Sequence, residues 1–155
     1  MCSAKSTLYV LIGVSGSGKS AYAEKMCQNT KLKVVSTDAI RKEILGSESD
    51  QKDGWKIFRE AYARLNGFLA KGKDVVFDAT NTTKKGRADL LKNLKAPCSK
   101  VAVLVVPPLD VAIERNVGRV RRVPESVIRR QYDQLIRDGE SIPNQFDEII
   151  FLKDK

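Results

Sequence analysis

The chain has 155 residues, of which 42% are hydrophobic and 30% are charged, so its length and composition are those of one folded domain. It contains no histidine, and its three cysteines are scattered, which excludes Ser-His-Asp and Cys-His catalysis and suggests neither a disulfide framework nor a zinc site. Its formal net charge of +9 favours a polyanionic partner such as nucleic acid, although a basic surface also serves plain solubility.

Hydrophobic periodicity predicts strands that alternate with helices along the chain. Strands are expected at 7–12, 32–36, 73–79, 99–106 and 147–152, and helices at 18–29, 38–46, 52–71, 83–94, 109–118 and 124–137. This alternation predicts an α/β fold, a three-layer parallel sheet of about five strands with helices on both faces. We expect residues 1–155 to form a single domain, without a membrane span because the apolar runs are only strand-length. Unpaired cysteines favour a cytoplasmic location, and nothing in the sequence predicts an oligomeric state.

The segment at 13–20, Gly-Val-Ser-Gly-Ser-Gly-Lys-Ser, fits the phosphate-binding loop pattern and lies between an expected strand and an expected helix. Glycines let several backbone N–H groups converge on one anion, and the following helix adds the positive end of its dipole. Lys19 is expected to contact the outer phosphates, and the Ser20 hydroxyl to ligate Mg²⁺. The predicted nucleotide-binding residues in this loop are Gly13, Ser15, Gly16, Ser17, Gly18, Lys19 and Ser20.

Asp38 follows the second expected strand, on the sheet edge where ligands bind in open α/β folds. Arg41 lies three residues later, on the same face of the expected helix. A carboxylate beside a guanidinium suits an alcohol acceptor, since one takes the proton and the other holds a neighbouring phosphate. The alternatives are a helix N-cap for Asp38 and a surface ion pair for Arg41.

Asp78 ends the third expected strand, where a phosphate-loop enzyme places a carboxylate near Mg²⁺, and Thr80 and Asn81 follow it in the next turn. Arg115 and Arg119, four residues apart in an arginine-rich segment, project the same way from an expected helix. Arginines brought over a transferring phosphoryl group stabilise its charge, although an exposed basic helix is the simpler reading of that segment.

Two apolar stripes at helical spacing are typical of core packing, and we expect both to be buried. The first comprises Phe58, Ala61, Tyr62, Leu65, Phe68 and Leu69. The second comprises Val127, Ile128, Tyr132, Leu135 and Ile136. The single tryptophan, Trp55, is expected near the surface.

Over essentially its whole length the chain resembles the 5′-hydroxyl polynucleotide kinases, the kinase domain of bacteriophage and bacterial end-healing enzymes. The resemblance is carried by the loop at 13–20, Ser-Thr-Asp-Ala-Ile-Arg at 36–41, Phe-Asp-Ala-Thr-Asn at 77–81, Glu-Arg-Asn-Val-Gly-Arg at 114–119 and the segment at 123–132. It implies a P-loop kinase fold with an arginine-rich lid at about 115–123, with ATP as phosphate donor and Mg²⁺ as cofactor. The implied acceptor is the 5′-hydroxyl end of DNA or RNA.

The resemblance also implies a role for each matching residue. Asp38 would be the general base, Arg41 would bind the acceptor's adjacent phosphate, and Arg119, with Arg115, would reach the phosphoryl group from the lid. Lys19 and Ser20 would hold phosphates and Mg²⁺, with Asp78 supporting the metal. The same frame also serves kinases of small molecules, so a nucleoside, nucleotide, sugar or antibiotic hydroxyl is the alternative acceptor. A third possibility is a non-catalytic module that binds ATP only as a ligand.

Overall fold

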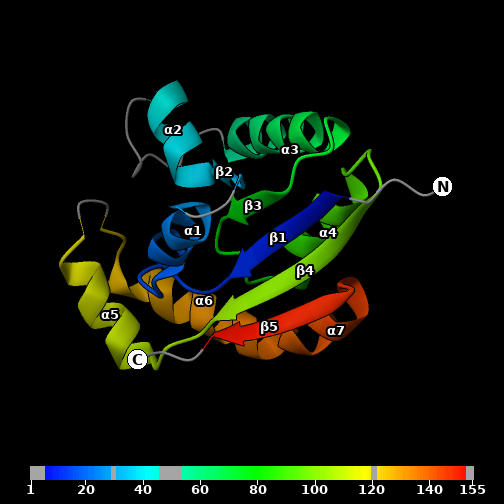
Figure 1. The fold of residues 1–155 in the computed structure, drawn as a ribbon. Helices are drawn as coiled ribbons and strands as arrows, with labels where there is room; N and C mark the ends of the chain where they lie inside the picture. Colours follow the sequence, from blue (N-terminus) through cyan, green and yellow to red (C-terminus); the bar gives the residue numbers. More distant parts are fainter. Residues whose placement is uncertain (1–5, 29–30, 46–53, 120–121, 153–155) are drawn as a thin grey trace.

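The computed structural model describes residues 6–28, 31–45, 54–119 and 122–152, and its centre is a parallel sheet (Figure 1). The sheet has five strands in the order β2-β3-β1-β4-β5, and every neighbouring pair is parallel. The predicted fold class is therefore confirmed. The strands are β1 (Ser6–Ile12), β2 (Lys33–Ser36), β3 (Val75–Asp78), β4 (Cys98–Val105) and β5 (Glu148–Leu152).

Six helices match the predicted ones, although positions 29, 46, 52 and 53 of the expected ranges lie outside the described residues. They are α1 (Lys19–Gln28), α2 (Thr37–Leu45), α3 (Gly54–Ala70), α4 (Lys84–Lys92), α5 (Leu109–Val117) and α6 (Glu125–Asp138). Two short elements after α6 were not predicted, the 3₁₀ turn η1 (Gly139–Ser141) and α7 (Ile142–Gln145). Both are too short to show a hydrophobic period. None of the helices in the described ranges is long and apolar enough to cross a membrane.

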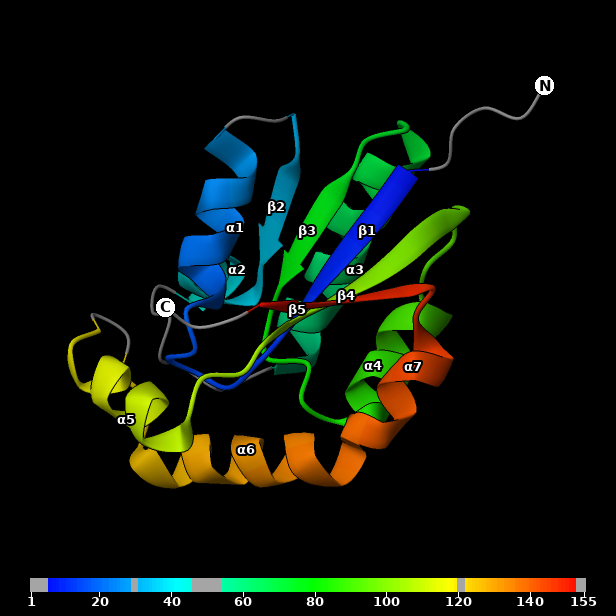
Figure 2. The same ribbon diagram turned by 60° about the horizontal axis from the view of Figure 1, so that its bottom comes forward.

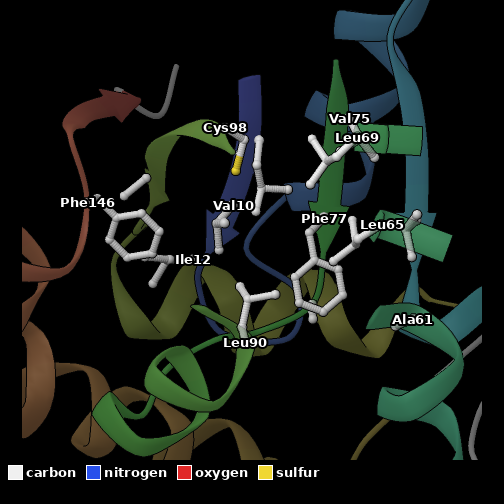
Figure 3. Close-up of a cluster of buried hydrophobic side chains, with 14 of the residues drawn as sticks. Val10, Ile12, Ala61, Leu65, Leu69, Val75, Phe77, Leu90, Cys98 and Phe146 are labelled. Carbon is white, nitrogen blue, oxygen red and sulfur yellow. The ribbon is translucent and has the colours of Figure 1, made fainter. Parts of the chain in front are cut away.

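Alternating side chains of the strands supply two separate hydrophobic clusters, one on each face of the sheet. In β1, Leu8 and Val10 join the larger cluster, whereas Leu11 joins the smaller one on the opposite face. The larger cluster packs against α2, α3, α4, α6 and α7, and Figure 3 shows Leu65, Phe77 and Leu90 within it. The smaller cluster packs against α1, so helices cover both faces, as expected for a parallel sheet.

The predicted burial of the two apolar stripes is only partly correct. On α3, Ala61, Leu65 and Leu69 are buried, but Phe58 is 36% exposed. On α6, Ile128 and Leu135 are buried, whereas Ile136 is 68% exposed. The stripes are wider than the faces that meet the core, so the residues at their margins reach the surface.

The carboxyl ends of β1, β2 and β3 meet at one edge of the sheet, with the loop before α1 among them (Figure 2). Register pairs Ser36 at the end of β2 with Asp78 at the end of β3. Successive strands change from one side of β1 to the other, because β2 and β3 lie to one side of it and β4 to the other. Such a switch point is where open α/β folds bind ligands.

Candidate active site

The loop between β1 and α1 has the backbone conformation that its glycines allow. Gly16 and Gly18 have φ of 82° and 100°, a region that residues with a Cβ rarely adopt. A Cβ at Gly16 would also lie 2.5 Å from the carbonyl oxygen of Ala112, so α5 packs directly on the loop. The Gly13 N–H donates to the Thr80 carbonyl oxygen at 3.0 Å, which ties the loop to the end of β3.

Lys19 and Ser20 open α1 and lie where the loop meets β3. Lys19 is 8% exposed, and its Nζ donates to the Val14 carbonyl oxygen at 3.0 Å across the loop. The Ser20 hydroxyl donates to Asp78 Oδ2 at 2.8 Å. Residues 58 positions apart in the sequence are therefore joined at the point that the predicted Mg²⁺ site requires.

Asp78 is buried, with an exposed fraction of 7%. Burial raises the pKa of its carboxyl, while the charge of Lys19 and the hydrogen bond from Ser20 lower that pKa in part. The described residues contain no cluster of three or more carboxylate, cysteine or histidine side chains for a metal. The Ser20–Asp78 pair nevertheless fits Mg²⁺, which takes oxygen ligands and commonly uses only one or two protein side chains beside phosphates and water.

Asp38 lies in the first turn of α2, but it is not the cap of that helix. Ser36 takes that role, since its Oγ accepts from the Ala39 N–H at 3.2 Å. The Asp38 carboxylate instead contacts Arg41, whose Nη1 donates to Oδ1 at 3.1 Å. The Arg41 side chain is 8% exposed and that of Asp38 is 30% exposed, so the pair faces a cavity rather than open solvent.

Arg119 and Arg115 approach the same region from the end of α5. Arg119 Nη2 lies 3.8 Å from Asp38 Oδ2, and its buried Nη1 has no hydrogen-bond partner among the described residues. Arg115 Nη1 donates to the Ser17 carbonyl oxygen at 3.2 Å, within the loop itself. The predicted lid spans 115–123, of which positions 120 and 121 lie outside the described residues.

Two cavities meet at these side chains. The first, of about 170 Å³, has Asp38, Arg41 and Asp78 in its wall, and we call it the Asp38 cavity. The second, of about 220 Å³, is bordered by Gly16, Gly18 and Arg115, and we call it the loop cavity. Three side chains belong to both walls: Lys19, Ser20 and Arg119. The two cavities are therefore neighbours, with a lysine and an arginine in both walls.

Three further residues shape the site, of which Gln131 and Phe58 were not predicted to do so. Gln131 on α6 accepts from the Ser15 N–H at 2.8 Å, so α6 orients the loop. Asn81 has a φ of 51°, and its Nδ2 donates to the Leu11 carbonyl oxygen at 2.8 Å, which fixes the turn after Asp78. Phe58, expected in the core, lines the Asp38 cavity. No local pattern marks Gln131 or Phe58, because each acquires its role through contact between distant elements.

A five-stranded parallel sheet in this order, with a phosphate loop after its central strand and a carboxylate ending β3, defines a P-loop kinase fold. A family model described as an AAA domain (AAA_33) matches residues 8–138, and the chain belongs to that family.

Individual proteins show the same likeness. The chain is 28% identical over 148 residues to L-seryl-tRNA(Sec) kinase of Methanococcus maripaludis, a match that covers 85% of this chain and 53% of that protein. Its fold superposes with a TM-score of 0.81 on a chain of the Pnkp1/Rnl/Hen1 RNA repair complex, at 20% identity, covering 90% of this chain and 47% of the other. A sugar kinase from Janibacter sp. HTCC2649 gives 0.69 at 21% identity, covering 97% and 87%. The chain thus spans about half the length of the first two relatives.

Proposed function

We propose that this chain is an ATP-dependent polynucleotide kinase, which transfers the γ-phosphate of ATP to the 5′-hydroxyl end of DNA or RNA. Residues 1–155 would form one P-loop kinase domain acting in the cytoplasm. The observation that carries the proposal is the position of Asp38. Its carboxylate lies in the wall of the Asp38 cavity and contacts Arg119, which borders the loop cavity as well.

On the donor side, the phosphates of ATP would occupy the loop cavity. Backbone N–H groups of the glycine-rich loop and the N-terminus of α1 favour an anion there. Lys19 and Arg119 border both cavities, so their charges lie on the path of the transferring phosphoryl group. Ser20 and Asp78 would hold Mg²⁺, which when bound neutralises charge on the phosphate oxygens.

On the acceptor side, Asp38 would accept the proton of the attacking hydroxyl. The new bond joins that oxygen to the γ-phosphorus of ATP, and the bond to the β-phosphate oxygen breaks, leaving ADP. Arg41 would bind the phosphate next to the terminal nucleoside and so position the hydroxyl, because its guanidinium lies in the wall of the same cavity. A segment at 115–123 closing over the phosphates would exclude water and suppress hydrolysis of ATP.

Two observations support a nucleic-acid acceptor. The formal net charge is +9, and a polynucleotide neutralises such charge with release of counterions. Two proteins of similar sequence or fold have names that refer to RNA or tRNA, the L-seryl-tRNA(Sec) kinase and the RNA repair complex.

A hydroxyl of a small molecule is the second candidate. The Asp38 cavity is only about 170 Å³, a volume that suits one sugar as well as one terminal nucleoside. The sugar kinase of similar fold also matches this chain over nearly the whole length of both. The two candidates differ in their salt dependence, since only a polynucleotide acceptor should show a KM that rises steeply with ionic strength.

The test is incubation with γ-labelled ATP and Mg²⁺ in the presence of 5′-hydroxyl oligonucleotides, seryl-tRNA, nucleosides, sugars and aminoglycosides. Labelled oligonucleotide ends, with a KM that rises with salt, are expected. Label on a sugar or nucleoside alone would establish the second candidate instead. Tight ATP binding without transfer to any acceptor would favour a non-catalytic module.

Asp38→Asn tests the proposed general base within the same assay. The substitution keeps the shape of the side chain but removes its capacity to accept a proton, so kcat should fall by about 10²–10⁴-fold. The KM for ATP should stay unchanged, because Asp38 does not border the loop cavity. Asp133→Asn, at an exposed carboxylate on α6, is the matched control. A kcat near that of the wild type in Asp38→Asn would refute the proposed role.

A further inference from the structure

The first two turns of α3 carry an aromatic side chain to the mouth of the Asp38 cavity. Phe58 lines that cavity together with Asp38 and Arg41, and it keeps 36% of its surface exposed. Its neighbours on the buried side of the helix, Ile57 and Ala61, are fully buried. Phe58 is therefore at the margin of the core, with part of its ring available to whatever enters the cavity.

Trp55 lies one helical turn before Phe58 and is 60% exposed, an unusual exposure for so large an apolar ring. It is outside the wall of the Asp38 cavity. Two cations lie against its ring, since Arg59 Cζ is 5.1 Å and Lys56 Nζ is 5.5 Å from the ring centroid. Side chains three and four residues apart share a helix face, so Trp55, Phe58 and Arg59 form one continuous surface.

We propose that Trp55, Phe58, Lys56 and Arg59 form a stacking platform for the first nucleotides of a single-stranded 5′-hydroxyl end. The proposal rests on the proposed polynucleotide kinase activity and names how its acceptor is held. Phe58 contacts the terminal nucleoside, whose hydroxyl lies at Asp38, and Trp55 stacks on a following base outside the cavity. Lys56 and Arg59 contact the phosphates that link these nucleotides.

The chemistry of the surface selects this ligand. Aromatic rings flanked by cations are how proteins bind single strands without reading sequence, because every base has a π-face and every linkage a charge. Phe58 belongs both to the platform and to the wall of the Asp38 cavity, so the platform begins at the cavity. A bound strand would therefore run from its 5′ end in the cavity towards Trp55. A sugar or a free nucleoside fills the cavity and reaches Phe58, but it ends before Trp55. Dependence on Trp55 therefore separates an extended acceptor from a small one.

Trp55 also supplies a direct signal, because it is the only tryptophan in the chain. Adding a 5′-hydroxyl hexanucleotide without ATP should quench tryptophan fluorescence in both the wild-type protein and Asp38→Asn. A nucleoside 3′-monophosphate should bind without that quenching. Because the fluorescence measures binding in the absence of phosphoryl transfer, it tests the platform separately from the kinase activity. Absence of quenching at oligonucleotide concentrations that saturate labelling would overturn the platform.

The kinetic test compares Trp55→Ala and Phe58→Leu with Phe151→Ala, which removes a still more exposed aromatic side chain, from β5. Trp55→Ala should raise KM for the hexanucleotide by roughly 5- to 100-fold and leave KM for the nucleoside 3′-monophosphate unchanged. Phe58→Leu keeps an apolar contact with the core but loses the ring, and it should raise both KM values. The melting temperatures of all three variants are measured alongside.

The outcomes separate the two proposals. If the wild type labels the hexanucleotide but Trp55→Ala has the same KM as Phe151→Ala, the platform is wrong and the kinase assignment stands. If the wild type labels no oligonucleotide and only a small molecule, the polynucleotide activity is wrong, and quenching by the hexanucleotide decides whether the surface binds single strands at all.

Discussion

Two arginines, the buried Arg87 and the partly exposed Arg119, occupy opposite situations in this molecule. Arg87 is 0% exposed, and its guanidinium donates to four oxygen acceptors, one each from the turn after β3, α6, η1 and α7, although burial lowers its pKa. Arg119 faces Asp38 at 3.8 Å and keeps a buried donor without a partner among the described residues. The acceptors of Arg87 are the carbonyl oxygens of Asn81 and Asp138, Ser141 Oγ and Gln145 Oε1.

The difference lies in how completely the hydrogen-bond donors of each guanidinium are satisfied. Buried polar groups in folded proteins are almost always satisfied, so the bonds of Arg87 mark it as part of the scaffold, whereas the unpaired donor of Arg119 is consistent with its proposed role in binding phosphate. The two are linked through the turn after β3. Arg87 holds the carbonyl oxygen of Asn81 at 2.8 Å, and Asn81 holds Leu11 beside the phosphate loop. Arg87 thus supports the loop beside which Arg119 is proposed to act.

Removing Arg119 should have the largest effect, and that effect should be on the reaction alone. Arg119→Ala should lower kcat by about 10³-fold, because an arginine that stabilises the transferring phosphoryl group contributes at least that much. The melting temperature should stay at the wild-type value, since the Arg119 side chain makes only a 3.8 Å ion pair with Asp38 among the residues that the structure describes. The labelling assay and thermal unfolding measure the two quantities.

Lys92→Ala is the matched control for Arg119→Ala, because it removes one positive charge from the exposed last turn of α4. It should change neither kcat nor melting temperature. Equal losses of activity in the two variants would mean that net charge, and not the position of Arg119, determines the rate. A marked loss of stability in Arg119→Ala would remove the contrast with Arg87.

Arg87→Met should do the reverse and act on stability first. The thioether side chain fills much of the same volume but removes all four hydrogen bonds that the guanidinium donates. We expect the free energy of unfolding to fall by about 3 kcal/mol, the scale of losing hydrogen bonds to a buried charge. Urea unfolding measures this change. Well below its melting temperature the variant should keep most of its kcat.

Arg129→Met is the control for Arg87→Met, since Arg129 forms an exposed ion pair with Glu125 at 3.0 Å. Exposed pairs of this kind contribute little, so its free energy of unfolding should stay within about 1 kcal/mol of the wild type. If Arg87→Met proved as mild as Arg129→Met, the four hydrogen bonds would not be what holds α4 against η1 and α7.

The sequence predicted the elements and the side chains that local patterns specify. The phosphate loop, Asp38 with Arg41, and Asp78 at a strand end each follow from a short motif and its place in a βα unit. The structure places all of them at one sheet edge, where Ser20 contacts Asp78 and Arg119 contacts Asp38.

What could not be predicted depends on packing between distant elements. In the sequence, Arg87 cannot be distinguished from a basic residue on an exposed helix, because its burial depends on contact with α7. The helix α7 is itself too short to show a hydrophobic period in the sequence. Gln131 reaches the loop from a helix that begins more than a hundred residues later. Phe58 belongs to an apolar stripe whose inner members are buried. Its ring lines the cavity because of how α3 packs in the fold, which the sequence pattern does not specify.

The smallest expected effect concerns Asp138, which joins the end of α6 to the start of α4 beside Arg87. Its pKa falls from 3.8 to about 2, chiefly through its hydrogen bond with Arg137 and then through the Lys84 N–H. A carboxyl with a lower pKa in the folded chain stabilises the fold above its unfolded-state pKa, and this contribution is lost as the pH falls through the folded-state value.

Asp138→Asn should therefore be slightly less stable than wild type at pH 7, with the difference closing between about pH 4 and about pH 2. Urea unfolding across that range measures it, with Asp133→Asn, at an exposed carboxylate on the same helix, as control. A difference that persisted unchanged at the acid end would mean that Asp138 acts through the shape of the α6–α4 junction and not through its charge.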